Sequence, residues 1–212
     1  TAKGELKGKI TDPDISINFN VDYPHYKGIR IREIWEGDIK NENNEFLLNM
    51  KNRYSPIPSF LSINFDSNLK LDNLSFSRIF NSTKGSIEVI NDNNSYIWTA
   101  DKFPLDELEL SIRNNQFDRI KGIINGSGLI SSNQSYLDGR LAWSLGKYRN
   151  IELDNSLFDF SFKNNIFNVS SSLYPIDGGI IELEYNSNEN NLINCFDLQF
   201  LQLLSFINHL YQ

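Results

Sequence analysis

The chain has 212 residues, of which 40% are hydrophobic and 13% aromatic, and its formal net charge is −7. This hydrophobic content allows a sizeable core and is unlike that of a disordered segment. The acidic balance argues against a nucleic-acid-binding protein, which needs a clustered basic surface, and against strong electrostatic attachment to an anionic bilayer.

Alternating apolar and polar residues predict β-strands along most of the chain. The clearest run covers residues 15–23, where every odd position is apolar and every even position is polar. Such alternation is typical of a strand with one apolar face and one solvated face. Similar runs occur at 63–65, 69–71, 74–76, 87–89, 96–98, 108–112, 141–145, 158–162, 167–169 and 181–185. Turn-forming clusters separate these runs, which predicts a meandering antiparallel sheet and an all-β fold.

The C-terminal residues break the alternation. Asp197 can cap a helix from about 198 to 211, because apolar residues follow it at helical spacing. About fourteen helical residues span roughly 21 Å, which is too short for a bilayer core of about 30 Å. We therefore expect a short apolar helix over one end of the sheet, and a shorter copy at 74–80.

Short motifs recur at an offset of roughly 120 residues. Residues 4–10 (GELKGKI) return at 122–130 (GIINGSGLI), and residues 43–48 (NNEFLL) return at 164–169 (NNIFNV). The Pro-Ile pair at 56–57 and the strand after it also return at 175–176. Recurrence at a fixed period is typical of stacked arrays.

This period predicts two units, residues 1–114 and 115–212, in one continuous array. Because the first residues lead directly into a strand pattern, with no signal peptide, we expect the chain to be a piece of a longer protein.

No catalytic or metal-binding set converges in the sequence. His25 and His209 lie far apart, and neither has a partner at metal-ligand spacing. The single cysteine, Cys195, excludes an internal disulfide and a multi-cysteine metal site. We therefore predict a protein that is not an enzyme and holds no metal and no cofactor.

Two acidic pairs keep a hydrolase as a less favoured hypothesis. Glu107 and Glu109 would share one face of a strand, as would Glu182 and Glu184. Paired carboxylates can hydrolyse glycosidic bonds. Opposite an apolar face, however, such pairs are expected to form a solvated outer surface.

The apolar faces of the strands are the remaining candidates for function. The candidate residues are Ile15, Ile17, Phe19, Val21, Leu141, Trp143, Leu145, Phe158, Phe160 and Phe162. A sheet with such a face must cover it with a second sheet, curl around it, or bind an apolar ligand. A packed core and an open apolar groove both fit this pattern.

Several motifs resemble the repeats of the TamB family, the AsmA-like envelope bridge proteins of diderm bacteria and chloroplasts. Residues 4–10 with the following Asp12-Pro13 are similar to the family's G-x-L-x-G-x-(I/V)-x-x-P repeat opening. Residues 98–108 (WTADKFPLDEL) resemble the segment before such a repeat, particularly in cyanobacterial members. Residues 126–129, 138–141 and 173–179 continue the pattern, so the resemblance covers most of the chain.

The resemblance implies an elongated, strongly curved antiparallel sheet, a U-shaped β-taco that crosses the periplasm. Its hydrophobic groove would conduct phospholipid between inner and outer membranes and support outer-membrane biogenesis. The implied partners are phospholipid acyl chains, neighbouring repeats and an Omp85-type outer-membrane barrel. The inner-membrane anchor helix and the barrel-binding region would lie outside these 212 residues.

Two alternatives stay open. The chain could be a structural or assembly scaffold for outer-membrane protein insertion or translocation, with a packed β core and edges that pair with client strands. It could also form a transmembrane barrel, since barrel strands alternate as well. Many runs here are shorter than the roughly 9–11 residues of a spanning strand, which disfavours the barrel.

Overall fold

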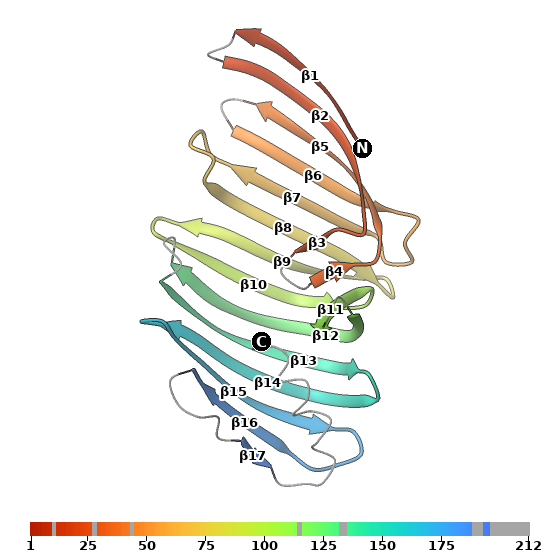
Figure 1. Ribbon diagram of the computed structural model, residues 1–212, viewed down its shortest axis with the longest axis vertical. Coiled ribbons are helices and arrows are strands. Elements are labelled where there is room, and N and C mark those ends of the chain that lie inside the picture. The colour runs from red at the N-terminus through yellow and green to blue at the C-terminus, as the bar shows by residue number, and fades with distance from the viewer. Residues whose placement is uncertain are drawn as a thin grey trace.

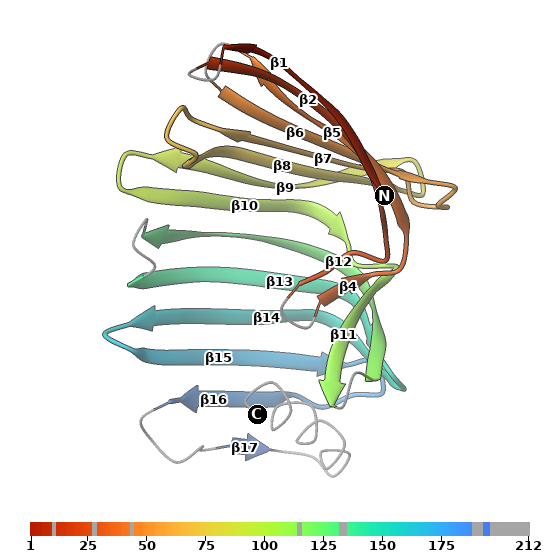
Figure 2. The same cartoon turned by 45° about the horizontal axis from the view of Figure 1, so that its top comes forward.

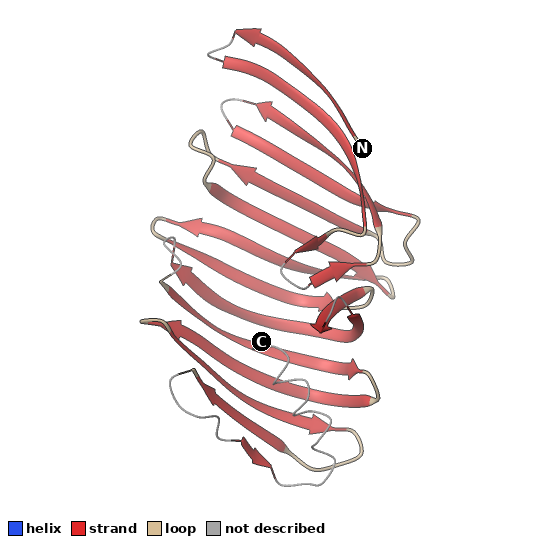
Figure 3. Cartoon of the chain, in the orientation of Figure 1, coloured by secondary structure: helices blue, strands red, loops and turns tan. Residues whose placement is uncertain are grey.

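The structure is a computed structural model, and it describes residues 1–9, 12–26, 29–42, 45–113, 116–131, 135–187 and 193–195. These residues form strands, turns and loops and contain no helix (Figure 3). The strands are β1 (Ala2–Lys9), β2 (Asp12–Asp22), β3 (His25–Tyr26), β4 (Ile29–Ile31), β5 (Ile34–Glu42), β6 (Glu45–Arg53), β7 (Ser59–Phe65), β8 (Leu71–Phe80), β9 (Thr83–Asp92), β10 (Ser95–Pro104), β11 (Leu108–Arg113), β12 (Gln116–Ser131), β13 (Tyr136–Tyr148), β14 (Ile151–Lys163), β15 (Ile166–Pro175), β16 (Ile181–Asn186) and β17 (Ile193–Cys195).

Fourteen strands form one long antiparallel ladder, in which almost every strand pairs with its neighbours in the sequence (Figure 1). The order is β1-β2-β5-β6-β7-β8-β9-β10-β12-β13-β14-β15-β16-β17. Within the described residues, β1 and β17 lie at opposite ends and pair with one strand each, so the sheet is open. This confirms the all-β, antiparallel prediction.

Three short strands form a branch, which we call the side sheet. Strand β3 pairs with β4, β4 pairs with β11, and β11 pairs with the first residues of β12. The side sheet thus joins a segment between β2 and β5 to a segment between β10 and β12. Figure 2 shows β4 and β11 beside the bent end of β12.

A line of irregularities crosses neighbouring strands at one end of the ladder. The register shifts between Ala100 and Phe103 in β10, again where β12 pairs with β13, and again where β14 pairs with β15. Lys102, Gly122 and Leu145 have positive φ angles of 46°, 116° and 52° at these points. Bulges bend strands and increase their twist. The strands therefore turn at this line (Figure 2).

The main core lies at this bent end. Its residues are Phe103, Leu108, Ile120, Trp143, Tyr148, Leu153, Leu173, Ile181 and Leu183. Trp143 donates a hydrogen bond from Nε1 to the carbonyl of Lys121 at 2.9 Å, and its ring lies over Gly122. A Cβ at Gly122 would come within 2.5 Å of Trp143 Nε1, so this close approach requires glycine as much as the φ angle does.

Two helix predictions have different outcomes. The expected helix at 74–80 is wrong, because these residues belong to strand β8 and pair with both β7 and β9. Leu74 and Phe76 alternate with serines, and the ladder satisfies the backbone hydrogen bonds that a helix would have made. The expected helix at 198–211 lies outside the described residues.

Candidate functional site

Cross-strand pairing places one uninterrupted line of apolar residues and glycines across twelve strands. Residues directly opposite each other in a ladder lie on the same face of the sheet. The line, which we call the apolar row, consists of Ile17, Ile39, Leu48, Ile63, Leu74, Val89, Trp98, Gly128, Gly139, Phe160, Val169 and Tyr185. At a strand spacing of about 4.8 Å, the row is about 50 Å long. All twelve residues are partly buried.

The two glycines of the apolar row make room for aromatic rings. Trp98 and Phe160 stack with ring centroids 5.9 Å apart and an interplanar angle of 14°. A Cβ at Gly139 would lie 2.4 Å from Trp98 Cζ2 and 2.8 Å from Phe160 Cζ. The rings therefore cover the positions where the glycines lack side chains, and the row stays apolar there.

A second line of the same kind runs beside the first on the same face. Its residues are Phe19, Gly37, Met50, Leu61, Phe76, Ile87, Ala100, Gly126, Leu141, Phe158, Ser171 and Leu183. Only Ser171 is polar. We call the face that carries both lines the apolar face.

Nine of the ten residues predicted from the sequence lie on the apolar face: Ile15, Ile17, Phe19, Val21, Leu141, Trp143, Phe158, Phe160 and Phe162. Trp143 belongs to the core at the bent end, whereas Phe160 is only partly buried. Whether any of them contacts a ligand stays a prediction.

Leu145 does not follow the predicted alternation. Strand β13 contains one more residue than β12 between Ser144 and Lys147. Because of this bulge, Gly146 and Tyr148 take the buried positions after Trp143. Leu145 has a φ of 52° and is 68% exposed. Placing Leu145 beside Trp143 was wrong, because a bulge shifts the phase of the strand by one residue.

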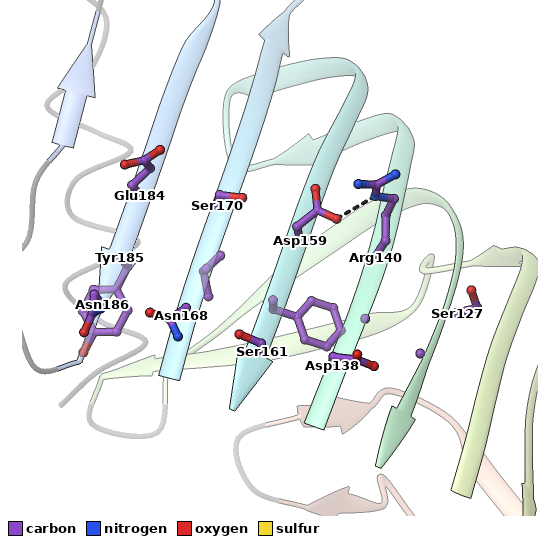
Figure 4. A pocket seen from close by; sticks show the side chains of 14 residues that line it. Ser127, Asp138, Arg140, Asp159, Ser161, Asn168, Ser170, Glu184, Tyr185 and Asn186 are labelled. Atoms are coloured by element: carbon purple, nitrogen blue, oxygen red, sulfur yellow. Dashed lines mark hydrogen bonds and ion pairs between the residues drawn. The ribbon is translucent and has the colours of Figure 1, made fainter. Parts of the chain in front are cut away.

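The opposite face carries an equally continuous polar row. Its residues are Asn18, Asp38, Asn49, Ser62, Ser75, Glu88, Thr99, Ser127, Arg140, Asp159, Ser170 and Glu184. Two hollows of about 800 and 790 Å³ lie along this row. In the first, Arg140 Nε lies 2.6 Å from an oxygen of Asp159, which raises the pKa of Arg140 (Figure 4). Sequence reasoning did not predict these hollows.

The predicted acidic pairs have separate outcomes. Glu182 and Glu184 are exposed on the polar face, as predicted. Glu107 lies outside β11 with a φ of 65°, and Glu109 is buried against Arg30, with Glu109 Oε2 2.7 Å from Arg30 Nε. The predicted solvated pair at 107 and 109 is therefore wrong, since Glu109 is the buried partner of a basic residue from β4.

A buried ion pair joins the segment before β5 to β8, and the sequence offered no local signal for it. Arg78 Nη2 lies 3.1 Å from Glu33 Oε1, and both side chains are almost fully buried. Arg78 also donates to Ser59 Oγ and to the carbonyl of Pro104. Burial lowers the pKa of Arg78, and the neighbouring Glu33 acts in the opposite direction.

Other candidate groups do not converge. His25 is exposed in β3, and His209 lies outside the described residues. In the described part of the chain, no three His, Cys, Asp or Glu side chains are grouped as a metal site would require. The same residues include no helix with the length and apolarity needed to cross a membrane.

The predicted units, residues 1–114 and 115–212, stay a prediction, and β10 and β12 pair directly across their boundary.

No protein-family model, no curated protein and no solved structure matches this chain.

Proposed function

We propose that this chain is a segment of an envelope bridge protein whose apolar face carries phospholipid acyl chains between two membranes. In this proposal the sheet is one stretch of a longer curved groove built from repeats, similar to the TamB-type β-taco. The groove lies in the periplasm and continues into neighbouring repeats, and the chain acts without enzymatic chemistry.

The observation that supports this proposal is the apolar row. An acyl chain is a flexible apolar rod that needs continuous contact along its length, and a polar group in the path would raise the free energy of passage. The row offers apolar side chains from ten of twelve consecutive strands of the ladder, and the rings of Trp98 and Phe160 cover the two glycine positions. It runs across the strands, so its length increases with every strand that is added.

The proposed transfer is passive. Each CH₂ group loses about 0.8 kcal/mol of favourable free energy when it moves from an apolar medium into water. A chain that passes from bilayer to apolar face keeps its CH₂ groups out of water and avoids most of that penalty. Headgroups would stay at the solvated rim. The direction of phospholipid transfer would be set by the two membranes and not by this chain.

Two variants of adjacent residues on β14 test the proposal. Phe160 lies in the apolar row, while Ser161 points to the polar face. We expect the purified wild-type chain to retain phospholipid that mass spectrometry detects. Phe160→Asp should lose most of this lipid because it places a charge in the row, whereas Ser161→Asp should retain it.

Folding is checked in parallel by circular dichroism and by the midpoint of urea unfolding. Phe160 is partly buried, so the variant should remain folded. A wild-type chain free of lipid, or equal lipid in both variants, would contradict the proposal.

A structural or assembly scaffold is the second candidate, and the open edge of the sheet favours it. Strand β1 pairs only with β2 among the described residues. An unpaired strand edge presents backbone donors and acceptors that can bind an extended client strand. In this case Phe160→Asp should lower the free energy of unfolding without any loss of lipid, since none would be bound.

A further inference from the structure

The side sheet has an apolar inner face and a basic outer face. Ile31 packs against the core, and Leu108 and Ile120 belong to it. Arg30, Glu109 and Arg119 lie opposite one another on β4, β11 and β12, and so share the other face. Arg32 lies two residues beyond Arg30 and completes this group, which we call the arginine cluster.

One carboxylate, that of Glu109, lies within 4.0 Å of all three guanidinium groups in this cluster. Arg30 contacts Glu109 Oε2 with Nε at 2.7 Å and with Nη2 at 2.5 Å. Arg32 Nη1 and Arg119 Nε lie 4.0 and 3.8 Å from Glu109 Oε1. The last two distances exceed hydrogen-bond range, so Arg32 and Arg119 are held near Glu109 without donating to it.

Asp118, the acidic neighbour of Arg119 in the sequence, has other partners. Asp118 Oδ2 lies 2.6 Å from Arg149 Nε and also accepts from the Tyr148 hydroxyl. Asp106 and Glu107 act electrostatically on the buried Arg78. Within the described residues the arginine cluster therefore holds three positive charges and one negative charge, in a chain whose net charge is −7.

The remaining donors are accessible to a ligand. The side chains of Arg32 and Arg119 are 50% and 49% exposed, while that of Glu109 is 6% exposed. Both guanidinium groups approach the same carboxylate oxygen, Arg32 from the residue after β4 and Arg119 from β12, so they face one common spot beside Glu109. A planar guanidinium group can bind two oxygens of a phosphate in paired hydrogen bonds, whereas a lysine ammonium group acts as a point charge.

We propose that Arg32 and Arg119 form a binding site for a phosphate group. The group can belong to free phosphate or to the headgroup of a phospholipid, and only the lipid source rests on the proposed function. Arg30 is not the main ligand, because Glu109 already occupies it.

The test compares the double variant Arg32→Gln/Arg119→Gln with Arg140→Gln. Arg140 is also an exposed arginine beside a carboxylate, but it lies on the polar face. Inorganic phosphate is titrated into each purified chain at low salt, and binding is followed by calorimetry and by the shift in unfolding midpoint that a bound ligand causes. We expect the double variant to bind at least about tenfold more weakly and the Arg140→Gln variant to bind like wild type.

A second arm identifies the source of the phosphate. Short-chain phosphatidylglycerol below its micelle concentration is compared with diacylglycerol of the same chain length. If the double variant weakens phosphatidylglycerol binding, the headgroup uses this site; if it weakens binding of inorganic phosphate alone, the ligand is free phosphate. Wild-type binding that is undetectable, or unchanged in the double variant, overturns the inference.

The arginine variants should remain folded, because Arg30 still pairs with Glu109 and two repelling charges are removed. The outcome is separable from that of the lipid proposal. Loss of lipid in Phe160→Asp with unchanged phosphate binding in the double variant refutes the site alone. Unchanged lipid in Phe160→Asp with weaker phosphate binding in the double variant refutes only the proposal that the apolar face carries lipid.

Discussion

The hairpins β6-β7 and β15-β16 carry similar short sequence motifs, yet the loops within them differ in burial. Ile57, between β6 and β7, is 3% exposed, whereas Ile176, between β15 and β16, is 60% exposed. Both follow a proline, Pro56 in the loop after β6 and Pro175 at the end of β15. The difference therefore arises from what lies beside each loop.

The first loop is fixed by contacts from several directions. Asn52 donates to the carbonyl of Ile57 at 2.7 Å and accepts from the Ser59 backbone N–H at 2.8 Å. Ser55 donates to Glu33, which arrives from the segment that also forms the side sheet. The second loop closes with a backbone bond from Gly178 N–H to the carbonyl of Pro175, and Gly178 has a φ of 104°. A recurring motif thus predicts a strand and a turn, while a distant segment decides whether the turn is buried.

Removal of the buried charge behind the first loop should destabilise the chain most. Arg78→Met leaves Glu33 buried without its partner, which should lower the free energy of unfolding by about 3–5 kcal/mol. Urea denaturation followed by tryptophan fluorescence measures this change. Arg140→Met on the polar face is the matched control and should leave the free energy of unfolding nearly unchanged, because exposed ion pairs contribute little. Equal costs for the two variants would contradict the role of the buried pair.

The loops themselves give the next largest effect. Ile57→Ala should lower the free energy of unfolding by about 2–5 kcal/mol, since it opens a cavity in a closed site. Ile176→Ala should change it by no more than about 0.5 kcal/mol, because the side chain is largely in water. Chemical denaturation of both variants under one condition is sufficient. Similar values for the two would show that the loops are equivalent despite their different exposure.

A glycine of the apolar row should give a smaller change in stability. Ile17 of β2 and Gly139 of β13 both lie in the apolar row, but only Gly139 lies beneath stacked rings. Gly139→Ala should cost about 1–3 kcal/mol, because its Cβ overlaps Trp98 and Phe160. Ser127→Ala on the adjacent polar row serves as the control and should be nearly neutral. A Gly139→Ala variant as stable as wild type would mean that the two rings can separate without cost.

The strands and the shared face were predictable from the sequence because alternation is a local property. Nine of the ten predicted residues lie on the apolar face, since each strand pairs with neighbours whose alternation has the same phase. Leu145 was misplaced because a single inserted residue reverses that phase. No local pattern indicates where a bulge will occur.

The features that depend on distant pairing were not predictable. The Arg78–Glu33 pair spans 45 residues, and the Arg30–Glu109 contact spans 79. Neither residue of either pair lies in a recurring motif, and periodicity does not encode which charged side chains will meet. The arginine cluster and the two polar hollows belong to the same class, because they are assembled from several strands by the register of the ladder.

The long-range contacts also have a consequence for how this chain folds. A ladder in which each strand touches only its sequence neighbours behaves as a one-dimensional chain of units, which can begin to fold anywhere and fray from its ends. The pairing of β4 with β11 encloses β5 to β10 in a single loop, and the Glu33–Arg78 bond tightens it from inside. These strands, and β13 to β16 through the shared core, are therefore expected to fold and unfold together, whereas β1 and β17 at the two ends of the described ladder can fray first.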